Sequence, residues 1–549
     1  MTVERVVLTG FSGTGKSTVG RLLAAQLGWT LVDVDTEIEQ ASGSTIPAIF
    51  SRQGESAFRA LEREQLLRAL GMAHVVIATG GGAVVADDAW SGDVLRRPRT
   101  LVISLESAPA GILRRLQAQV ALENETIERP LLAGDDPLGR ISSLKASRQS
   151  AYDRADVTIP TDEVTAEDVA RSIANLVAPP TAPTVVLMAG GTRSDIVVRP
   201  GIRHEIGTHI AARWPRARKA FIVTETNVGI LHSHTIGASL SGAGLETAVL
   251  TVKPGETSKS WDIVGDVIGQ MLAAGIQRND IVVALGGGVI GDLAGFAASV
   301  VLRGVALVQV PTSLLAMVDS SVGGKTGVNA PTGKNLIGTF YQPPLVLIDS
   351  ELLHTLPPRE LNQGWAEVVK HAIIQPSTPD GPRVELQTLL ERNVAHLRAL
   401  REPAISLAIA RNVRLKASVV AADEREASLR AILNFGHTIG HAIEAAEYRY
   451  LHGEAIAVGM RAATHIALLR GMVSSSFETA LAERLQAFGL PLSAEFDPET
   501  VLDRMKSDKK STAGVQTWVL PVEEGGVELT TNVDQSLVRE ALAFVRSGG

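Results

Sequence analysis

The chain has 549 residues, of which 45% are hydrophobic and 20% charged, and its formal net charge is −7. This length is too great for one hydrophobic core and indicates about two to four globular domains. The negative charge argues against a surface that binds nucleic acid. Cysteine is absent, which excludes disulfides and thiolate metal sites, so any transition metal has to be held by His, Asp or Glu.

The apolar run near the start of the chain, Val6–Leu8, is too short for the core of a signal peptide and leads directly into a glycine-rich loop. No uninterrupted apolar stretch of about 18 residues occurs anywhere, so the sequence predicts no membrane-spanning helix. We therefore expect a cytoplasmic protein that acts on small molecules and has neither a membrane nor a nucleic acid as partner.

In the first part of the chain, short apolar runs alternate with helix-like segments. The runs Val6–Leu8, Val75–Ala78 and Leu101–Leu105 predict buried strands, and the alternation is typical of a parallel α/β sheet. Residues 177–184 read Val-Ala-Pro-Pro-Thr-Ala-Pro-Thr, and a segment so rich in proline continues neither a helix nor a central strand. We expect it to be a linker that follows a first domain of residues 1–176.

The alternation restarts after the linker and predicts an α/β domain of residues 185–357. Its predicted strands are Val185–Met188, Ala220–Val223, Ile281–Leu285, Ala306–Val310 and Leu345–Ile348. Beyond about residue 358 the strand signals become sparse, and long segments such as Ile405–Ala422 and Ile456–Arg470 predict amphipathic helices. The sequence thus predicts a helical domain of residues 358–549.

A phosphate-binding motif follows the first predicted strand. Residues 10–17 read Gly-Phe-Ser-Gly-Thr-Gly-Lys-Ser and fit G-x-x-x-x-G-K-[ST], with the helical segment Thr18–Leu27 directly after them. Such a loop wraps phosphate oxygens with backbone N–H groups, Lys16 supplies a cation, and Ser17 can bind Mg²⁺. The alternative is a plain glycine-rich turn, which the strand–loop–helix order disfavours. The predicted nucleotide-binding residues here are Gly13, Thr14, Gly15, Lys16, Ser17 and Thr18.

The rest of the first domain resembles the shikimate kinase family. The resemblance depends on Val32–Asp35, Phe58–Arg59, Gly80–Ala83, Arg129–Leu132 and Arg148 with Tyr152, in the family's order and at about its spacing. It implies that Asp35 holds the accepting hydroxyl of shikimate, that Arg59 and Arg148 bind its carboxylate, and that Gly81 contacts its ring. It also implies that Arg129 lies on a lid near the phosphates of ATP and that Asp33 lies near Mg²⁺. These roles agree with phosphoryl transfer, which needs positioning and charge neutralisation, and with carboxylate recognition by arginine.

A second site is indicated after residue 280. Gly286–Asp292 follow a predicted strand, as a turn that approaches a dinucleotide pyrophosphate would, although such turns are also common without a ligand. His437 and His441 stand four residues apart, which places both imidazoles on one helical face. With His452 and Glu367 they predict a His/Glu metal site, and the spacing alone does not choose among the three histidines. Zinc, or cobalt in its place, suits two imidazoles and a carboxylate with an open position for a substrate oxygen.

Residues 185–549 resemble the 3-dehydroquinate synthase family. The resemblance depends on the segments 310–329, 333–338, 365–370, 433–441 and 451–454. It implies that Glu367, His437 and His452 bind the metal, that His441 faces the substrate, and that Asp319, Lys325 and Lys370 are catalytic. The residues it implies for NAD are Gly255, Glu256, Lys259, Gly288, Val289, Ile290, Gly291, Asp292, Thr312, Ser313, Lys325 and Lys334. The residues it implies for the sugar phosphate are Arg303, Lys370, Lys416, Arg430, Asn434, His441 and one of Lys509 or Lys510, with Lys510 preferred.

Together the two resemblances imply a P-loop kinase domain with a parallel sheet, fused to a Rossmann-like α/β domain and a C-terminal all-helical domain. The implied activities are ATP-dependent phosphorylation of shikimate, with Mg²⁺, and conversion of a heptulosonate phosphate to dehydroquinate, with NAD and a divalent metal. A homo-oligomer, with the dimer formed through the synthase part, is expected from the resemblance. Three alternatives remain open: a cyclase for another sugar phosphate, a polyol dehydrogenase of related fold, and one half that binds ligand without catalysis.

Overall fold

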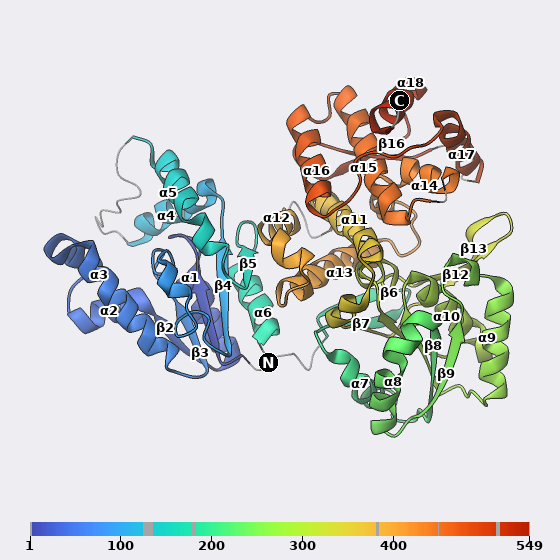
Figure 1. The fold of residues 1–549 in the computed structure, drawn as a ribbon, viewed down its shortest axis with the longest axis horizontal. Coiled ribbons are helices and arrows are strands. Elements are labelled where there is room, and N and C mark those ends of the chain that lie inside the picture. Colours follow the sequence, from blue (N-terminus) through green and yellow to red (C-terminus); the bar gives the residue numbers. More distant parts are fainter. Residues whose placement is uncertain are drawn as a thin grey trace. The chain divides into compact units, whose positions relative to one another are not determined.

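The computed structural model describes residues 3–123, 135–177, 183–379, 384–447, 449–511 and 516–547. The chain forms two compact units, the first made of residues 1–180 and 388–407 and the second of residues 181–387 and 408–549 (Figure 1). Most of the predicted linker, residues 178–182, lies outside the described residues. Within the described ranges, every helix is too short or too polar to cross a lipid bilayer.

The first unit is built on a parallel sheet with the strand order β2-β3-β1-β4-β5. The strands are β1 Arg5–Thr9, β2 Thr30–Asp33, β3 Val75–Ala78, β4 Thr100–Glu106 and β5 Val157–Pro160. The helices are α1 Lys16–Leu27, α2 Val34–Ser42, α3 Ile46–Leu70, α4 Pro109–Glu123, α5 Pro137–Tyr152 and α6 Ala166–Val177. Strands β3 and β5 are buried along their whole length, as expected for a parallel sheet covered by helices, whereas the edge strand β2 is partly exposed.

The position of the loops follows from this topology. In a parallel sheet the loops after the carboxyl ends of the strands meet at one edge, which is where such folds bind ligands. The loop after β1 contains the P-loop motif, the chain after β2 enters α2 through Asp33, and the loop after β3 contains Gly80–Gly82. The sheet therefore brings three sequence-predicted motifs to the same edge.

The outer strand β5 of this sheet is completed by residues that come much later in the chain. The buried side-chain amide of Asn393, within the 388–407 segment of the first unit, accepts a hydrogen bond from Thr158 N at 2.9 Å and donates one to Thr158 O at 2.8 Å. Arg392 also lies 3.3 Å from the buried carboxylate of Glu106, which pairs with Lys145 at 2.6 Å. The bonds from Asn393 satisfy backbone groups at the edge of β5, and Arg392 adds a second cation beside the buried Glu106 at the end of β4.

The second unit is built on a seven-stranded sheet with the order β6-β7-β14-β11-β10-β8-β9 among the described residues. Only the pairing of β6 with β7 is antiparallel. These strands are β6 Val185–Ala189, β7 Thr192–Val198, β8 Lys219–Glu225, β9 Glu246–Val252, β10 Ile281–Gly286, β11 Ala306–Pro311 and β14 Leu345–Ile348, and β12 Lys325–Ala330 pairs with β13 Gly333–Phe340 in a separate hairpin. The helices of this part are α7 Ile206–Arg213, α8 Thr226–Gly242, α9 Trp261–Ala273 and α10 Gly288–Val300.

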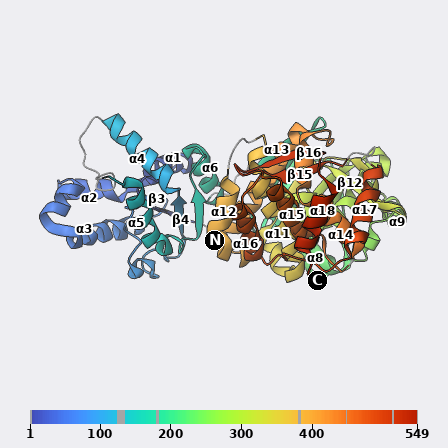
Figure 2. The ribbon, with the colours of Figure 1, turned by 90° about the horizontal axis from the view of Figure 1, so that it is seen from above.

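The later part of the second unit is helical, as the sequence predicts. Its helices are α11 Pro358–Ile374, α12 Glu385–Arg398 and α13 Ala404–Ala422 (both partly in the first unit), α14 His437–Ala446, α15 His452–Leu469, α16 Ser475–Ala487, α17 Pro498–Ser511 and α18 Gln535–Val545. Helix α15 packs against α11, α14 and α18, and Figure 2 shows these helices together. The sequence analysis did not anticipate the two-stranded sheet of β15 Trp518–Pro521 and β16 Val527–Thr530, so this part is not entirely helical.

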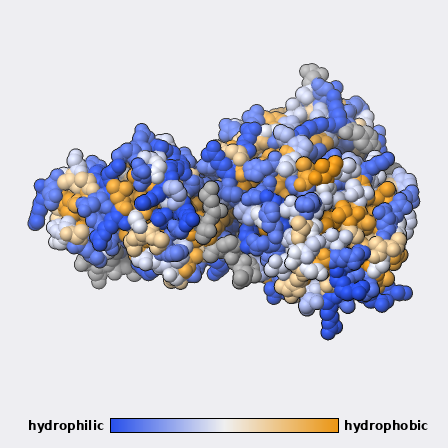
Figure 3. Space-filling model, turned by 60° about the horizontal axis from the view of Figure 1, so that its bottom comes forward, coloured by the Kyte–Doolittle hydropathy of each residue, from blue (hydrophilic) through white to orange (hydrophobic). Residues whose placement is uncertain are grey.

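The surface is mixed in character. On the face drawn in Figure 3, hydrophilic residues cover most of each unit and hydrophobic residues form patches among them. The described second unit includes apolar side chains with high exposure, such as Ile230 at 78% and Leu336 at 62%.

Candidate active sites

The P-loop of the first unit has the geometry needed to hold phosphate. Gly13 and Gly15 adopt φ values of 81° and 95°, a left-handed conformation that favours glycine. Lys16 Nζ donates hydrogen bonds to the carbonyls of Gly10 and Phe11, each at 2.9 Å, so its ammonium lies over the loop. Burial lowers the pKa of Lys16 to about 8, although the nearby carboxylates of Asp35 and Asp33 oppose the shift. A phosphate in the loop would supply the counter-charge that this cation lacks.

Two carboxylates face the loop. Ser17 Oγ donates to Asp33 Oδ2 at 2.6 Å, and Asp33 also caps the start of α2 by accepting from Thr36 N. A hydroxyl beside a carboxylate is a donor set that suits Mg²⁺. Burial raises the pKa of Asp35 to about 6, with Asp33 adding to the rise and Lys16 opposing it. Asp35 can therefore exchange a proton near neutral pH.

Arg59, one of the predicted carboxylate-binding residues, and Asp35 both lie against the glycine turn after β3, Gly80–Gly82. A Cβ atom at Gly82 would lie 2.4 Å from Arg59 Nη1, and a Cβ atom at Gly80 would lie 2.9 Å from Asp35 Oδ1, so neither position has room for a side chain. Arg59 Nη1 also donates to the buried carboxylate of Glu62 at 2.6 Å. The absence of side chains in this turn is thus what lets the guanidinium and the carboxylates approach it.

Arg148 reaches the same turn from α5. Its Nη1 lies 3.4 Å from Gly81 O, and Tyr152 donates its hydroxyl to the same oxygen at 2.6 Å. The structure therefore brings Lys16, Asp35, Arg59, Gly81 and Arg148 around one edge of the sheet. Arg129 lies outside the described residues. The sequence analysis missed Glu62, although its spacing of three residues from Arg59 places both on one helical face and could have indicated the pair.

In the second unit, α10 begins directly after β10. Gly288 is the first residue of α10, and a side chain there would approach Ser320 Oγ to 3.0 Å. The helix N-terminus and its glycines leave backbone N–H groups open toward a phosphate. Val289, Ile290 and Gly291 form the first turn of the helix, and Thr312 and Ser313 follow the neighbouring strand β11. Thr312 N donates to Gly286 O at 3.0 Å, which joins the two loops.

A polar network connects Glu256, Lys259 and Asp292, three more of the predicted NAD residues. Lys259 Nζ lies 2.5 Å from both Asp292 Oδ2 and Asn335 Oδ1. Asn329 donates to Glu256 Oε1 at 2.8 Å and accepts from Asn335 N at 2.8 Å, so the segment containing Gly255 and Glu256 is tied to the β12–β13 hairpin. Burial raises the pKa of Asp292, although Lys259 opposes the shift.

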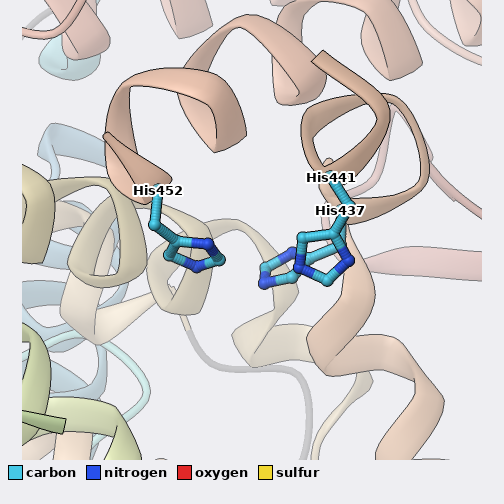
Figure 4. Close-up of side chains that lie close together, drawn as sticks. All are labelled: His437, His441 and His452. Atoms are coloured by element: carbon cyan, nitrogen blue, oxygen red, sulfur yellow. The ribbon is translucent and has the colours of Figure 1, made fainter. Parts of the chain in front are cut away.

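The three histidines gather between two helices. His437 and His441 project from α14 and His452 from the start of α15, and their rings face one another (Figure 4). Each histidine has a potential ligand atom within 4.8 Å of the others. His437 Nε2 and His452 Nε2 lie 3.6 and 3.5 Å from Glu367 Oε1.

This arrangement fits a divalent metal. Glu367 is fully buried and forms an ion pair with Lys370, but among the described residues neither of its carboxylate oxygens has a hydrogen bond of normal geometry. The Nδ1 atoms of His437 and His452 have acceptors, Phe435 O at 3.1 Å and Glu444 at 3.0 Å, which leaves each Nε2 for a metal. Burial lowers the pKa of His452, yet Glu367 and Glu444 raise it to about 9, so the surroundings of this imidazole favour positive charge. His441 is exposed and belongs to the same group of three histidines.

Buried lysines lie beside the two carboxylates of this site, Glu367 and Asp319. Lys370 pairs with Glu367 inside α11, and Lys416 Nζ lies 2.6 Å from Asp319 Oδ1. Burial alone would raise the pKa of Asp319, but Lys416 and Lys370 hold it below its usual value. Asp319 lies in a π-helical turn, Ala316–Ser320, a distortion that frequently marks functional positions.

A second group of predicted substrate residues meets around Glu426. Lys325 pairs with Glu426 Oε2, and Asn434 Nδ2 donates to Glu426 Oε1 at 3.0 Å. Arg430 is held by Asp423, whose Oδ2 accepts from Arg430 N at 2.9 Å. The sequence analysis missed Asp423 and Glu426, which have no motif of their own.

Four further predicted residues are not seen with this group: two lie elsewhere in the second unit, and two have side chains outside the described residues. Arg303 is exposed at the end of the 3₁₀ turn Val301–Arg303 that follows α10, and in the described part of the chain no hydrogen bond or ion pair is seen between it and the other predicted substrate residues. Lys334 pairs with Glu444 at 2.6 Å, next to the metal ligand His452. The side chains of Lys509 and Lys510 lie outside the described residues.

The fold and the two sites define a P-loop phosphotransferase joined to a metal-binding α/β enzyme. Family models described as "Shikimate kinase", "3-dehydroquinate synthase N-terminal" and "3-dehydroquinate synthase C-terminal" match residues 12–178, 249–363 and 364–511. The 3-dehydroquinate synthase of Symbiobacterium thermophilum is 45% identical over 361 residues, 65% of this chain and 99% of that protein. The enzyme of that name from Caulobacter vibrioides is 40% identical over 65% of this chain and 98% of its own.

A solved structure of a related cyclase is also similar to this chain. The 2-epi-5-epi-valiolone synthase ValA of Streptomyces hygroscopicus, with NAD⁺ and Zn²⁺ bound, is 30% identical with a TM-score of 0.59 over 64% of this chain and 96% of its own. The chain belongs to the 3-dehydroquinate synthase family and has a shikimate kinase domain at its N-terminal end. It is a bifunctional enzyme of the shikimate pathway.

Proposed function

We propose that the cluster of side chains in the first unit carries out the kinase reaction. The P-loop and Lys16 hold the phosphates of ATP, Ser17 and Asp33 bind Mg²⁺, and Asp35 orients the shikimate hydroxyl and accepts its proton. Arg59 and Arg148 bind the carboxylate of shikimate. Support comes from the shared glycine turn, which Asp35, Arg59 and Arg148 all approach, and from the raised pKa of Asp35.

We propose that the second unit uses Glu367, His437 and His452 to hold a divalent metal and the α10 end of the sheet to hold NAD. When bound, NAD supplies reversible oxidation of a substrate hydroxyl and the metal polarises substrate oxygens. The chain's own lysines, Lys325 and Lys370 with Lys416, neutralise the phosphate and the developing negative charge. His441, exposed beside the metal cluster, is the residue proposed to move a proton.

The observation that supports this function most is the 45% identity with a 3-dehydroquinate synthase over 99% of its length. A cyclase for another sugar phosphate is the alternative, since a 2-deoxy-scyllo-inosose synthase bound to carbaglucose-6-phosphate, NAD⁺ and Co²⁺ is 26% identical with a TM-score of 0.55. The lower identity makes that assignment the weaker one.

The test is a pair of assays on the full-length protein. Phosphate release is measured from deoxy-arabino-heptulosonate phosphate with NAD and zinc, and phosphoryl transfer is measured from ATP to shikimate with Mg²⁺. We expect activity in both assays and none with a hexose 6-phosphate in the first. Activity on the hexose phosphate alone would contradict the proposed substrate.

Shikimate phosphorylation is expected to fall as the pH drops through about 6. Burial, together with Asp33, raises the pKa of Asp35 to about 6, although Lys16 opposes the shift. Below that pH the protonated form of Asp35 predominates and cannot accept a proton. Bound Mg²⁺ adds positive charge and should move this acidic limb to lower pH. Measuring kcat/KM against pH at several Mg²⁺ concentrations checks both statements, and a limb that does not respond to Mg²⁺ would assign it to another group.

We also propose that the protein is cytoplasmic and forms a homo-oligomer, with the dimer made through the synthase part. The proposed domains are residues 1–176, 185–357 and 358–549, and the linker 177–184 connects the first to the second. The exposed apolar side chains Ile230 and Leu336 support an interface on the second unit.

A further inference from the structure

One carboxylate in the second unit lies between the predicted NAD site and the metal site. Glu444, on α14, accepts at Oε2 from His452 Nδ1 at 3.0 Å and at Oε1 from Lys334 Nζ at 2.6 Å. Lys334 belongs to strand β13 of the hairpin that also contains Asn335, which hydrogen-bonds to Lys259. Lys334 and Glu444 therefore connect this hairpin to His452.

The hydrogen bond from His452 Nδ1 to Glu444 fixes which ring nitrogen of His452 carries the proton and which way the ring is oriented. Because a carboxylate accepts from Nδ1, the proton stays on that nitrogen, and Nε2, 3.5 Å from Glu367, is the nitrogen that can bind a metal. The other histidine ligand is fixed differently, since His437 Nδ1 faces the neutral backbone carbonyl of Phe435. His452 is thus the ligand whose basicity and orientation depend on a side chain, and that side chain also binds a lysine.

Lys334 can adopt two positions, one paired with Glu444 and one turned away from it. In the structure the ammonium of Lys334 partly neutralises Glu444, whereas 52% of the Lys334 side chain is exposed and its long stem can turn toward a dinucleotide phosphate. Removing that ammonium leaves the full charge of Glu444 for His452, which strengthens the hydrogen bond to Nδ1 and makes Nε2 a better ligand.

We propose that Glu444 is a positioning residue that couples cofactor binding to metal binding: NAD draws Lys334 away from Glu444, and the released carboxylate tightens the hold of His452 on the metal. The inference rests on the proposed NAD and metal sites. By thermodynamic linkage, the metal must raise the affinity for NAD by the same factor.

The test measures binding rather than turnover. The affinity of the full-length apoprotein for Zn²⁺ is determined by competition with a chelator of known affinity, with and without saturating NAD, for the wild type, Glu444→Gln and Lys334→Met. Saturating NAD is expected to raise the Zn²⁺ affinity of the wild type at least about fivefold. Glu444→Gln should lower Zn²⁺ affinity about 10- to 100-fold, and both variants should lose the response to NAD.

The chain offers a matched control. His465 Nδ1 and Glu478 Oε1 form the same kind of pair at 2.8 Å, away from the metal histidines, so Glu478→Gln removes an equivalent bond and should leave both affinities unchanged. Thermal unfolding of each variant separates loss of a ligand from loss of fold, and Glu444→Asp should restore part of the Zn²⁺ affinity.

Unchanged Zn²⁺ affinity in Glu444→Gln, or no effect of NAD on the wild type, would overturn the inference. These outcomes are distinct from a failure of the proposed function. Turnover of the heptulosonate phosphate without coupling would overturn only the role of Glu444, whereas coupling without turnover would contradict only the assigned substrate.

Discussion

Replacing Lys16 by alanine is expected to lower the rate of shikimate phosphorylation about 10²- to 10³-fold, because a positioned cation that meets charge developing on the phosphoryl group is lost. In the structure Lys16 Nζ is held over the loop by two backbone carbonyls, so its position is set before ATP arrives. Phosphate release by the synthase should not change, since every residue proposed for that reaction lies in the second unit. Both assays are run on the same purified preparation.

The control for this variant is Arg21→Ala, which removes an exposed cation from the same helix α1. Arg21→Ala should leave both activities within about twofold, because exposed charges contribute little. A loss of both activities in Lys16→Ala would indicate misfolding, whereas full kinase activity in that variant would contradict the role of the loop.

The buried strands could be predicted from the sequence because each is apolar on both faces. Ile281–Leu285 was predicted, and β10 is Ile281–Gly286 with every residue buried. Strand β13 could not be predicted in this way, since Gly333–Phe340 is mostly exposed and exists through its pairing with β12. Edge and hairpin strands depend on partners that local periodicity does not report.

The candidate sites show a similar division. Motifs indicated the residues that act on ligands, such as Lys16 and the three histidines, because those chemistries require fixed spacings. The residues that hold them have no motif of their own: Glu62 pairs with Arg59 at i,i+3 within α3, and Glu444 reaches His452 only because α14 and α15 pack together. Spacing also could not rank the histidines, whereas in the structure two of them face Glu367 and have their Nδ1 atoms occupied.

Glu367→Gln is expected to abolish tight metal binding and to lower phosphate release from the heptulosonate phosphate by about 10³-fold or more, since metal polarisation of substrate oxygens is worth several kcal/mol. Although burial by itself raises the pKa of Glu367, Lys370 and the neighbouring histidines hold it well below its usual value, so the group is an anion at the centre of the site. The amide keeps the shape of the side chain but removes that charge. Shikimate phosphorylation should be unaffected, and chelation of the wild type should give the same pattern.

Glu360→Gln, which changes an exposed residue on the same helix α11, is the matched control and should bind metal normally. If Glu367→Gln retained tightly bound metal, the metal would have to be held by other ligands. Asp319 and His371, which form a second group with Glu367, are the two nearby alternatives. Metal analysis of dialysed protein, with both assays on the same samples, therefore decides whether the buried carboxylate is a ligand or only the counter-ion of Lys370.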